Sequence, residues 1–184
     1  MKGWMEDYTW TKPLLKYVKQ ILGLVFFGEP PIEEDQERNT DLMVLKLKGT
    51  SKVSDFRIAV RIRKFKYYSK YKNEFTIRSS RPSGVKTELE KILDGWGAYY
   101  FYGFANELET GIYCYTLADL RWISCWIKDY QVWHDGRYPG TEMPNEDGSS
   151  LFRCIRWSDI PKPDGTGFIL KRWDPDSTTL KERI

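Results

Sequence analysis

In the sequence DFRIAVRIRKFK, residues 55–66, large apolar side chains occupy every second position from 56 to 62, and most of the positions between them are basic. The apolar set is Phe56, Ile58, Val60 and Ile62, and the basic set is Arg57, Arg61 and Arg63. Because successive side chains of a strand point to opposite faces, this period of two predicts a β-strand with one face against a core. It is the clearest strand signal in the chain.

A helix and a strand are expected before this stretch. In TKPLLKYVKQILG, residues 11–23, apolar side chains recur at helical spacing opposite lysines, which predicts an amphipathic helix. Residues 29–40 are acidic and rich in proline, so they are expected to form a loop. DLMVLKLKG, residues 41–49, alternates leucine with lysine in its second half and predicts another strand.

Further elements are expected after it. NEFTIRS (73–79), AYYFYGFA (98–105) and GIYCYTL (111–117) predict strands, and LFRCIRW (151–157) and FILKRW (168–173) are short strand candidates. Thr87 with Glu90, and Thr116 with Asp119, have capping-box spacing and predict two helices, the second running through Ile127. This order of elements predicts an α/β (α+β) fold with a central mixed sheet flanked by helices.

Composition limits the class of protein. A chain of 184 residues, 41% of them hydrophobic, is long enough for one domain with a core, so residues 1–184 are expected to form a single domain. The longest apolar run falls far short of the roughly 20 residues of a membrane span. The N-terminus lacks the pattern of a signal peptide, and the three cysteines are scattered. We therefore expect a cytoplasmic protein with reduced, buried cysteines and no membrane contact.

Positive charge is concentrated in the middle of the chain. Residues 57–91 contain eleven bases against three acids. Aromatic residues are interleaved with these bases, notably in KYYSKYKNEF, residues 66–75, which is expected to be a loop that stacks on bases while its lysines follow the backbone. This distribution favours a DNA or RNA partner. A solvated lysine-rich face is the alternative.

The loop before the first capped helix is a candidate anion site. In FTIRSSRPSGVKTELEKILDGWG, residues 75–97, the bases Arg78, Arg81 and Lys86 lie just before a predicted helix start. Unpaired N–H groups at such a start favour an anion, and Ser83 with the following glycine allows close approach, so a phosphate is the expected ligand. Alternatively, Arg81 and Lys86 pair with Glu88 and Glu90.

Several other chemistries lack their motifs. SSRPSG has neither Walker nor dinucleotide-loop spacing, and the cysteines and one histidine lack the paired spacing of a closed zinc site. His134 lies in an expected turn without a cysteine motif around it, so a surface or packing role is expected for its imidazole.

The predicted order of elements over residues 11–105 resembles the core of the restriction-endonuclease-like, or PD-(D/E)XK, nucleases. In that family an acid at the start of one strand and a Glu-x-Lys on the next hold magnesium and activate water. Asp41 matches the first acid. The second strand offers Ala59-Val60-Arg61 or Arg61-Ile62-Arg63 instead, so Arg61 stands where the lysine belongs and the motif is degenerate.

The resemblance implies Mg²⁺ or Mn²⁺ as cofactor only if another acid completes the site. Asp41 and Glu88 are the preferred metal ligands, with Asp55 second and Glu33 or Glu34 third. Asp41, Glu88 and Arg61 would then be the catalytic residues of an active nuclease.

Three functions follow, in this order. The first is a nucleic-acid-binding protein with a degenerate nuclease-like core, in which phosphates contact Arg61, Arg63, Arg78, Arg81, Ser83 and Lys86. The second is a non-enzymatic factor of phage or mobile-element type that binds a host protein. The third is an active metal-dependent nuclease. Residues 106–184 are expected to extend the core with strands, a helix and a turn-rich cover.

Overall fold

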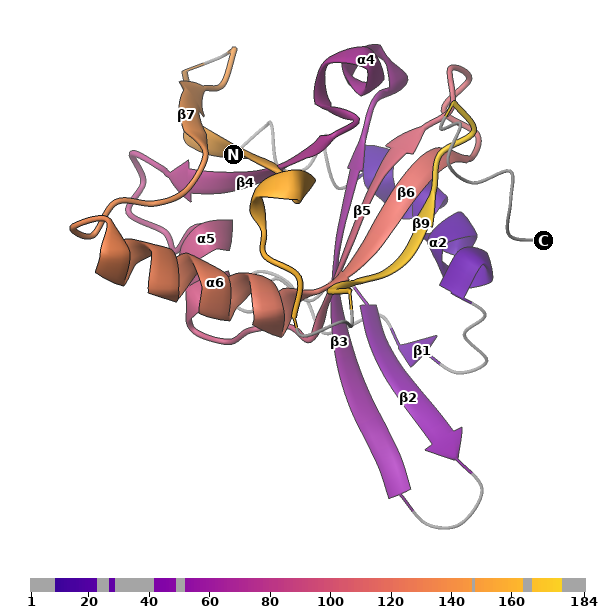
Figure 1. Ribbon diagram of the computed structural model, residues 1–184. Helices are drawn as coiled ribbons and strands as arrows, with labels where there is room; N and C mark the ends of the chain where they lie inside the picture. Colours follow the sequence, from indigo (N-terminus) through magenta and orange to yellow (C-terminus); the bar gives the residue numbers. More distant parts are fainter. Residues whose placement is uncertain are drawn as a thin grey trace.

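A six-stranded mixed sheet forms the centre of the protein, seen in this computed structural model (Figure 1). The structure describes residues 9–22, 27–28, 42–48, 52–146, 148–163 and 167–176. Within them the sheet order is β1-β2-β3-β5-β6-β9, and all neighbours are antiparallel except β3 and β5. Its strands are β1 (Phe27–Gly28), β2 (Leu42–Lys48), β3 (Lys52–Arg63), β5 (Tyr99–Ala105), β6 (Ile112–Asp119) and β9 (Ile169–Trp173).

A second sheet of three antiparallel strands has the order β4-β8-β7. Its strands are β4 (Glu74–Ser80), β7 (Thr141–Pro144) and β8 (Leu151–Arg156). The helical elements are η1 (Lys12–Leu14), α2 (Leu15–Leu22), η2 (Phe65–Tyr67), α4 (Tyr68–Tyr71), α5 (Glu88–Leu93), α6 (Leu120–Trp133) and η3 (Trp157–Asp159). The mixed sheet with flanking helices confirms the predicted fold class.

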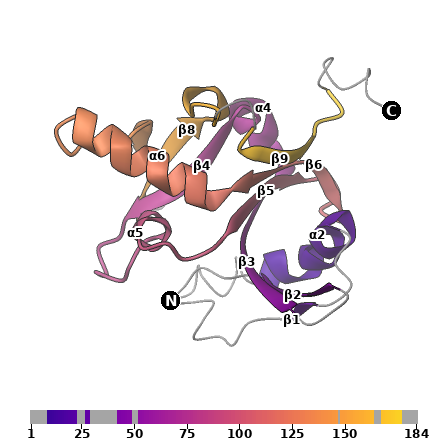
Figure 2. The ribbon, with the colours of Figure 1, turned by 60° about the horizontal axis from the view of Figure 1, so that its bottom comes forward.

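The first core lies between α2 and one face of the large sheet (Figure 2). Leu14, Leu15 and Val18 pack there against the apolar side of β3, which consists of Ile58, Val60 and Ile62. The apolar face of the helical residues 12–22 and the apolar face of β3 thus pack against each other. The arginines of β3 consequently lie on the opposite face of the sheet.

The second and larger core lies on that opposite face, between the large sheet, the small sheet, α5 and α6 (Figures 1 and 2). Tyr100 and Tyr102 of β5 contribute to this core, while Phe101 of the same strand belongs to the first core. Strand β5 is buried on both faces, which explains why its sequence is almost continuously apolar. The face of the large sheet that carries the β3 arginines therefore borders the second core, and part of it lies near the protein surface.

Differences from the sequence prediction include the pairing of β4 and the cap of α6. NEFTIRS does form a strand, but this strand, β4, pairs with β8 in the second sheet, because a strand pattern does not identify the partner strand. Helix α6 is capped by Asp119, whose carboxylate accepts the backbone N–H groups of Arg121 and Trp122. Thr116 lies in β6 and is not the cap, because β6 continues to Asp119.

Candidate nucleic-acid interface

An ion pair connects β3 to the start of α5. Nη1 of Arg61 lies 2.7 Å from Oε2 of Glu88, whose residue is only 9% exposed. The same carboxylate oxygen accepts the backbone N–H of Arg78 at 3.1 Å, and the Tyr100 hydroxyl donates to Oε1 at 3.4 Å. Both oxygens of Glu88 are thus engaged by groups of the chain itself. The structure brings together Arg61, Arg78 and Glu88 from the predicted site.

Arg63 is also held by the protein. Its Nη1 donates to Oγ1 of the fully buried Thr76 at 2.6 Å. Its guanidinium carbon lies 4.8 Å from the ring centroids of both Tyr67 and Tyr71. Because its polar and π contacts are made inside the fold, this arginine is a structural link between β3, β4 and α4.

Two buried tyrosines line the same network. The Tyr102 hydroxyl lies 3.4 Å from Oγ1 of Thr76. The single hydroxyl proton of Tyr100 is shared between Glu88 Oε1 and the carbonyl oxygen of Thr76, which lies 3.3 Å from the hydroxyl. Burial raises the pKa of Tyr102, and burial together with the Glu88 carboxylate raises that of Tyr100. Both phenols therefore stay protonated at neutral pH and act as hydrogen-bond donors.

The loop expected to hold a phosphate contains its own carboxylates. Thr87 and Glu90 form the predicted capping box, in which Thr87 Oγ1 accepts the backbone N–H of Glu90 and the Glu90 carboxylate accepts that of Thr87. Lys86 pairs with Asp94 and lies 4.6 Å from the ring centroid of Trp96. Two backbone N–H groups at the helix start are thus satisfied internally, which disfavours the phosphate site. The ion pairs also differ from the alternative interpretation, because Lys86 pairs with Asp94 and Glu88 pairs with Arg61.

The other two predicted residues of this loop differ in exposure. Arg81 is half-buried, and its buried Nε has no hydrogen-bond partner within the described structure. Ser83 is exposed. Neither residue is joined to the Arg61–Glu88 pair by an observed contact between described residues.

The metal site predicted from the resemblance cannot be assembled from the described residues. Asp41, Glu33 and Glu34 lie outside them, and of Asp55 only the strand backbone is described. Within the described ranges, no group of three or more His, Cys, Asp or Glu side chains could hold a metal ion. Because magnesium needs available carboxylate oxygens and those of Glu88 are engaged by cationic and N–H or O–H donors, Glu88 does not fit a metal ligand in this arrangement.

Histidine and cysteine chemistry find no support in the described geometry. His134 is exposed after the last residue of α6 and stacks on Tyr130 with 3.9 Å between ring centroids. Burial raises the pKa of the Cys114 thiol to about 12, and burial with Glu74 raises that of Cys154 to about 11. Both thiols are therefore protonated and poorly nucleophilic at neutral pH. Cys125 is exposed, so the expectation that all cysteines are buried was wrong.

Residues 66–75 do not form the expected stacking loop. They fold into η2, α4 and the start of β4, which buries the rings of Tyr68, Tyr71 and Phe75. Tyr68 also donates to Oδ1 of Asp174 at 2.7 Å. These rings belong to the core because each aromatic side chain can bury a large apolar area there, so stacking on bases by the three of them is excluded.

The lysines of this segment remain at the surface. Lys64, Lys66, Lys70 and Lys72 are all exposed. The ammonium groups of Lys66, Lys70 and Lys72 lie 4.8, 4.9 and 5.6 Å from the ring centroids of Tyr67, Tyr71 and Tyr68. We call these four lysines the lysine surface. Contact with these rings limits the orientations of the three ammonium groups, which remain on the solvent side.

A pocket of about 570 Å³ continues the lysine surface toward the C-terminal strands. It is lined by Ser69, Lys70, Lys72, Asn73, Glu74, Arg156, Trp157, Ser158 and Arg172. Four of these side chains are basic and one is acidic. Arg156 and Arg172 are not among the predicted site residues, although both short strand candidates end in Arg-Trp, a shared pattern that singles them out in the sequence.

Comparison of the chain with protein-family models, with curated proteins and with solved structures found no significant match. In the described part of the chain, no helix is both long and apolar enough to cross a membrane.

Proposed function

We propose that this protein binds nucleic acid on a nuclease-like core without performing hydrolysis. The observation that carries the proposal is the lysine surface. Residues 57–73 contain seven bases and no acid, and the four lysines of this stretch are all exposed in the folded chain. Exposed cations from a stretch without acids are the electrostatic feature that a polyanion requires. Of the four, Lys64 has an acidic neighbour in the fold, since its Nζ lies 3.8 Å from Oε1 of Glu109.

The topology supports the nuclease-like part of the proposal. Strands β1, β2 and β3 are successive antiparallel neighbours, and the chain then passes through α5 to β5, which is parallel to β3. Helix α2 precedes these strands in the sequence, so the elements follow the order expected for the restriction-endonuclease-like core. Segments η2, α4 and β4 are inserted before α5.

The ion pair supports binding in preference to cleavage. On β3, where that family carries its Glu-x-Lys, this chain has Arg61 paired with Glu88 at 2.7 Å. An arginine does not readily lose a proton and cannot replace a ligating carboxylate. We therefore assign Arg61 and Arg63 to the architecture of the core, and phosphate contacts to the exposed lysines.

The first experiment measures binding and cleavage together. Labelled single- and double-stranded DNA and RNA are incubated with the purified protein, with and without Mg²⁺ or Mn²⁺, and separated on native and denaturing gels. We expect binding that weakens steeply with salt, since released counterions supply the affinity, and no cleavage. Binding that is absent at low salt, or unchanged by salt, would refute the proposal. Metal-dependent cleavage that is lost in Asp41→Ala would instead support the active nuclease.

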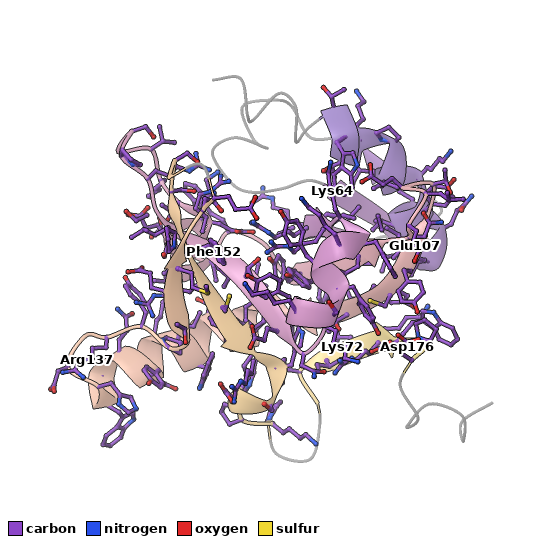
Figure 3. All side chains as sticks on the ribbon, turned by 90° about the horizontal axis from the view of Figure 1, so that it is seen from above. Lys64, Lys72, Glu107, Arg137, Phe152 and Asp176 are labelled. Carbon is purple, nitrogen blue, oxygen red and sulfur yellow. The ribbon has the colours of Figure 1, made fainter. Side chains whose placement is uncertain are left out.

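A charge-neutralising variant locates the interface. We expect Lys64→Gln with Lys66→Gln to lower the slope of log affinity against log salt by about 1 to 2. The matched control is Lys128→Gln with Arg137→Gln, which removes two exposed bases from the α6 region. In the view of Figure 3, Arg137 lies at one end of the molecule, well separated from Lys64. An equal effect of both variants would indicate only a general response to net charge.

A protein partner is the second candidate, and one observation favours it. Val132 and Trp133 near the end of α6 are 78% and 82% exposed. Large exposed apolar side chains of this kind occur in protein contacts. A pulldown from nuclease-treated lysate tests this role. A host protein that is retained by the wild type and lost with Trp133→Ala would support it, whereas loss on nuclease treatment would indicate a nucleic-acid bridge.

A further inference from the structure

The pocket beside the lysine surface has walls from three separate parts of the chain, residues 69–74, residues 156–158 and Arg172. Ser69, Lys70 and Lys72 come from α4 and its end, and Asn73 and Glu74 lead into β4. Arg156, Trp157 and Ser158 form the turn from β8 into η3, and Arg172 comes from β9. Figure 3 shows Lys72 on the α4 side, close to the end of β9. This convergence of cations is a product of the tertiary structure.

We propose that this pocket is a phosphate-binding subsite for a nucleic-acid strand, an inference that rests on the proposed function. Two lysines and two arginines face a single carboxylate, so the lining carries an excess of positive charge. Arginine supplies forked donors that match phosphate oxygens, lysine supplies point charges, and the hydroxyl of Ser69 adds a neutral donor. The Ser158 hydroxyl donates to Oδ1 of Asp159 at 3.4 Å.

The single acid in the pocket does not neutralise it. Glu74 lies opposite Arg156 in the β4–β8 register, and its Oε1 is 3.7 Å from the arginine Nε. That separation exceeds normal hydrogen-bond length, and the Arg156 side chain is 68% exposed. An exposed pair of this kind is weak in water, so a phosphate can compete for the guanidinium.

Hydrogen bonds across the walls hold the pocket open before a ligand arrives. Nη2 of Arg172 donates to the carbonyl oxygen of Lys72 at 3.3 Å, which fixes β9 against the end of α4. The backbone N–H of Trp157 donates to the carbonyl oxygen of Asn73 at 3.1 Å. The Trp157 ring is buried and packs on Phe75 with 4.4 Å between centroids. Because these walls are already ordered, little conformational entropy is lost on binding.

The pocket shares Lys70 and Lys72 with the lysine surface. A strand whose backbone follows the exposed lysines can therefore place one phosphate in the pocket. That phosphate is either the terminal monoester of the strand or an internal diester, since both present anionic oxygens to the same donors.

The test uses single-stranded DNA of about 12 nucleotides, within the site sizes of single-strand binders. Two probes carry a 3′ fluorophore and differ only in having a 5′-phosphate or a 5′-hydroxyl, and binding is measured by fluorescence anisotropy across a salt series. The pocket variant is Arg156→Gln with Lys72→Gln. The matched control is Lys128→Gln with Arg137→Gln, which removes the same charge outside the pocket. Melting temperatures of both variants verify that they are folded.

We expect the pocket variant to bind about tenfold more weakly than the control and to lower the salt slope by about 1. Loss confined to the phosphorylated probe assigns the pocket to a strand end, and equal loss with both probes assigns it to an internal phosphate. A second variant, Ser158→Glu, introduces a carboxylate without removing a base and is expected to weaken binding similarly.

The two proposals fail in different ways. Wild-type binding that the pocket variants leave equal to the control would overturn the pocket assignment and leave the proposed function intact. A wild type that binds neither probe nor any duplex at low salt would overturn both. If the double variant does not fold, Ser158→Glu tests the pocket assignment instead, because this variant keeps every base of the pocket.

Discussion

Arg61 and Lys70 are nine residues apart in one acid-free stretch, yet the fold uses their charges in opposite ways. Arg61 reaches from β3 to the buried carboxylate of Glu88, and its neighbour Arg63 is enclosed by Thr76 and two tyrosine rings. Lys70 is exposed at the rim of the pocket. The first region uses positive charge to join elements, and the second presents it to solvent. A run of bases in a sequence therefore does not by itself define a binding surface.

The largest expected effect tests the inner region. We expect Glu88→Ala to lower the free energy of unfolding by about 3 kcal/mol, the lower end for a broken buried pair, because the Arg61 side chain is 28% exposed. The loss leaves Arg61 and the Arg78 N–H without their carboxylate. Urea denaturation measures it. Combining Arg61→Leu with Glu88→Leu should recover more than half, and a single-variant loss below about 0.5 kcal/mol would contradict the structural role.

Arg63→Gln sharpens the contrast with the lysines. It removes the hydrogen bond to Thr76 and the contacts with two rings, so we expect a loss of about 2 kcal/mol in stability. Nucleic-acid affinity of the folded variant should change less than about twofold, because the side chain is turned inward. Lys66→Gln is the matched opposite, with weaker binding and stability within about 0.5 kcal/mol. A larger binding defect in Arg63→Gln than in Lys66→Gln would place Arg63 in the interface.

A smaller effect concerns the capping box of α5. We expect Thr87→Ala to cost about 1 kcal/mol at pH 7, as for other N-cap residues. Hydrogen bonds from the backbone and hydroxyl of Thr87 lower the pKa of Glu90 below its ordinary value of 4.5. The stabilisation is therefore present above about pH 4.5 and lost as pH falls through the folded-state pKa. Urea denaturation of wild type and variant at pH 7 and pH 3 should show the difference shrinking, and a difference that grows on acidification would contradict this.

The smallest effect is expected for the outer ion pair of the same loop. Lys86 and Asp94 have side chains that are 50% and 41% exposed. Exposed pairs contribute little because water and salt screen them, so Lys86→Ala should change stability by at most about 0.5 kcal/mol. The comparison with Glu88→Ala, made under the same conditions, measures how far burial and the further hydrogen bonds to Glu88 raise the contribution of an ion pair to stability. Equal losses from both variants would refute the distinction between inner and outer charge.

Local patterns predicted the individual elements well. The alternation of residues 55–66 gave the long strand β3 and its apolar face, and the Thr87–Glu90 spacing gave a real capping box. These features depend on neighbours within a few residues, where strand period and cap chemistry act directly. The wrong cap assignment at Thr116 is also a local error. Asp119, three residues later, can cap a helix as well, and strand β6 continues as far as Asp119.

The candidate site was predicted less well, because it depends on contacts across the chain. Glu88 was taken as a metal ligand, and its pairing with a base 27 residues earlier is not visible in any local pattern. The aromatic rings of residues 66–75 were expected at the surface, but Tyr68, Tyr71 and Phe75 are buried in the second core, and Tyr68 is hydrogen-bonded to Asp174. The pocket was missed because Arg156 and Arg172 come from distant strands.

The sequence by itself determined most of the strands, the longer helices with the Thr87 cap, and the concentration of positive charge in residues 57–91. Only the tertiary structure decided which of those charges are internal. Strand β3 packs its apolar face on α2, so its arginines lie on the opposite face. There Arg61 meets Glu88 of α5, and Arg63 meets Thr76 of the second sheet. The short helix α4 buries its tyrosines and leaves its lysines in water, because a cation that lacks a buried partner is costly to desolvate.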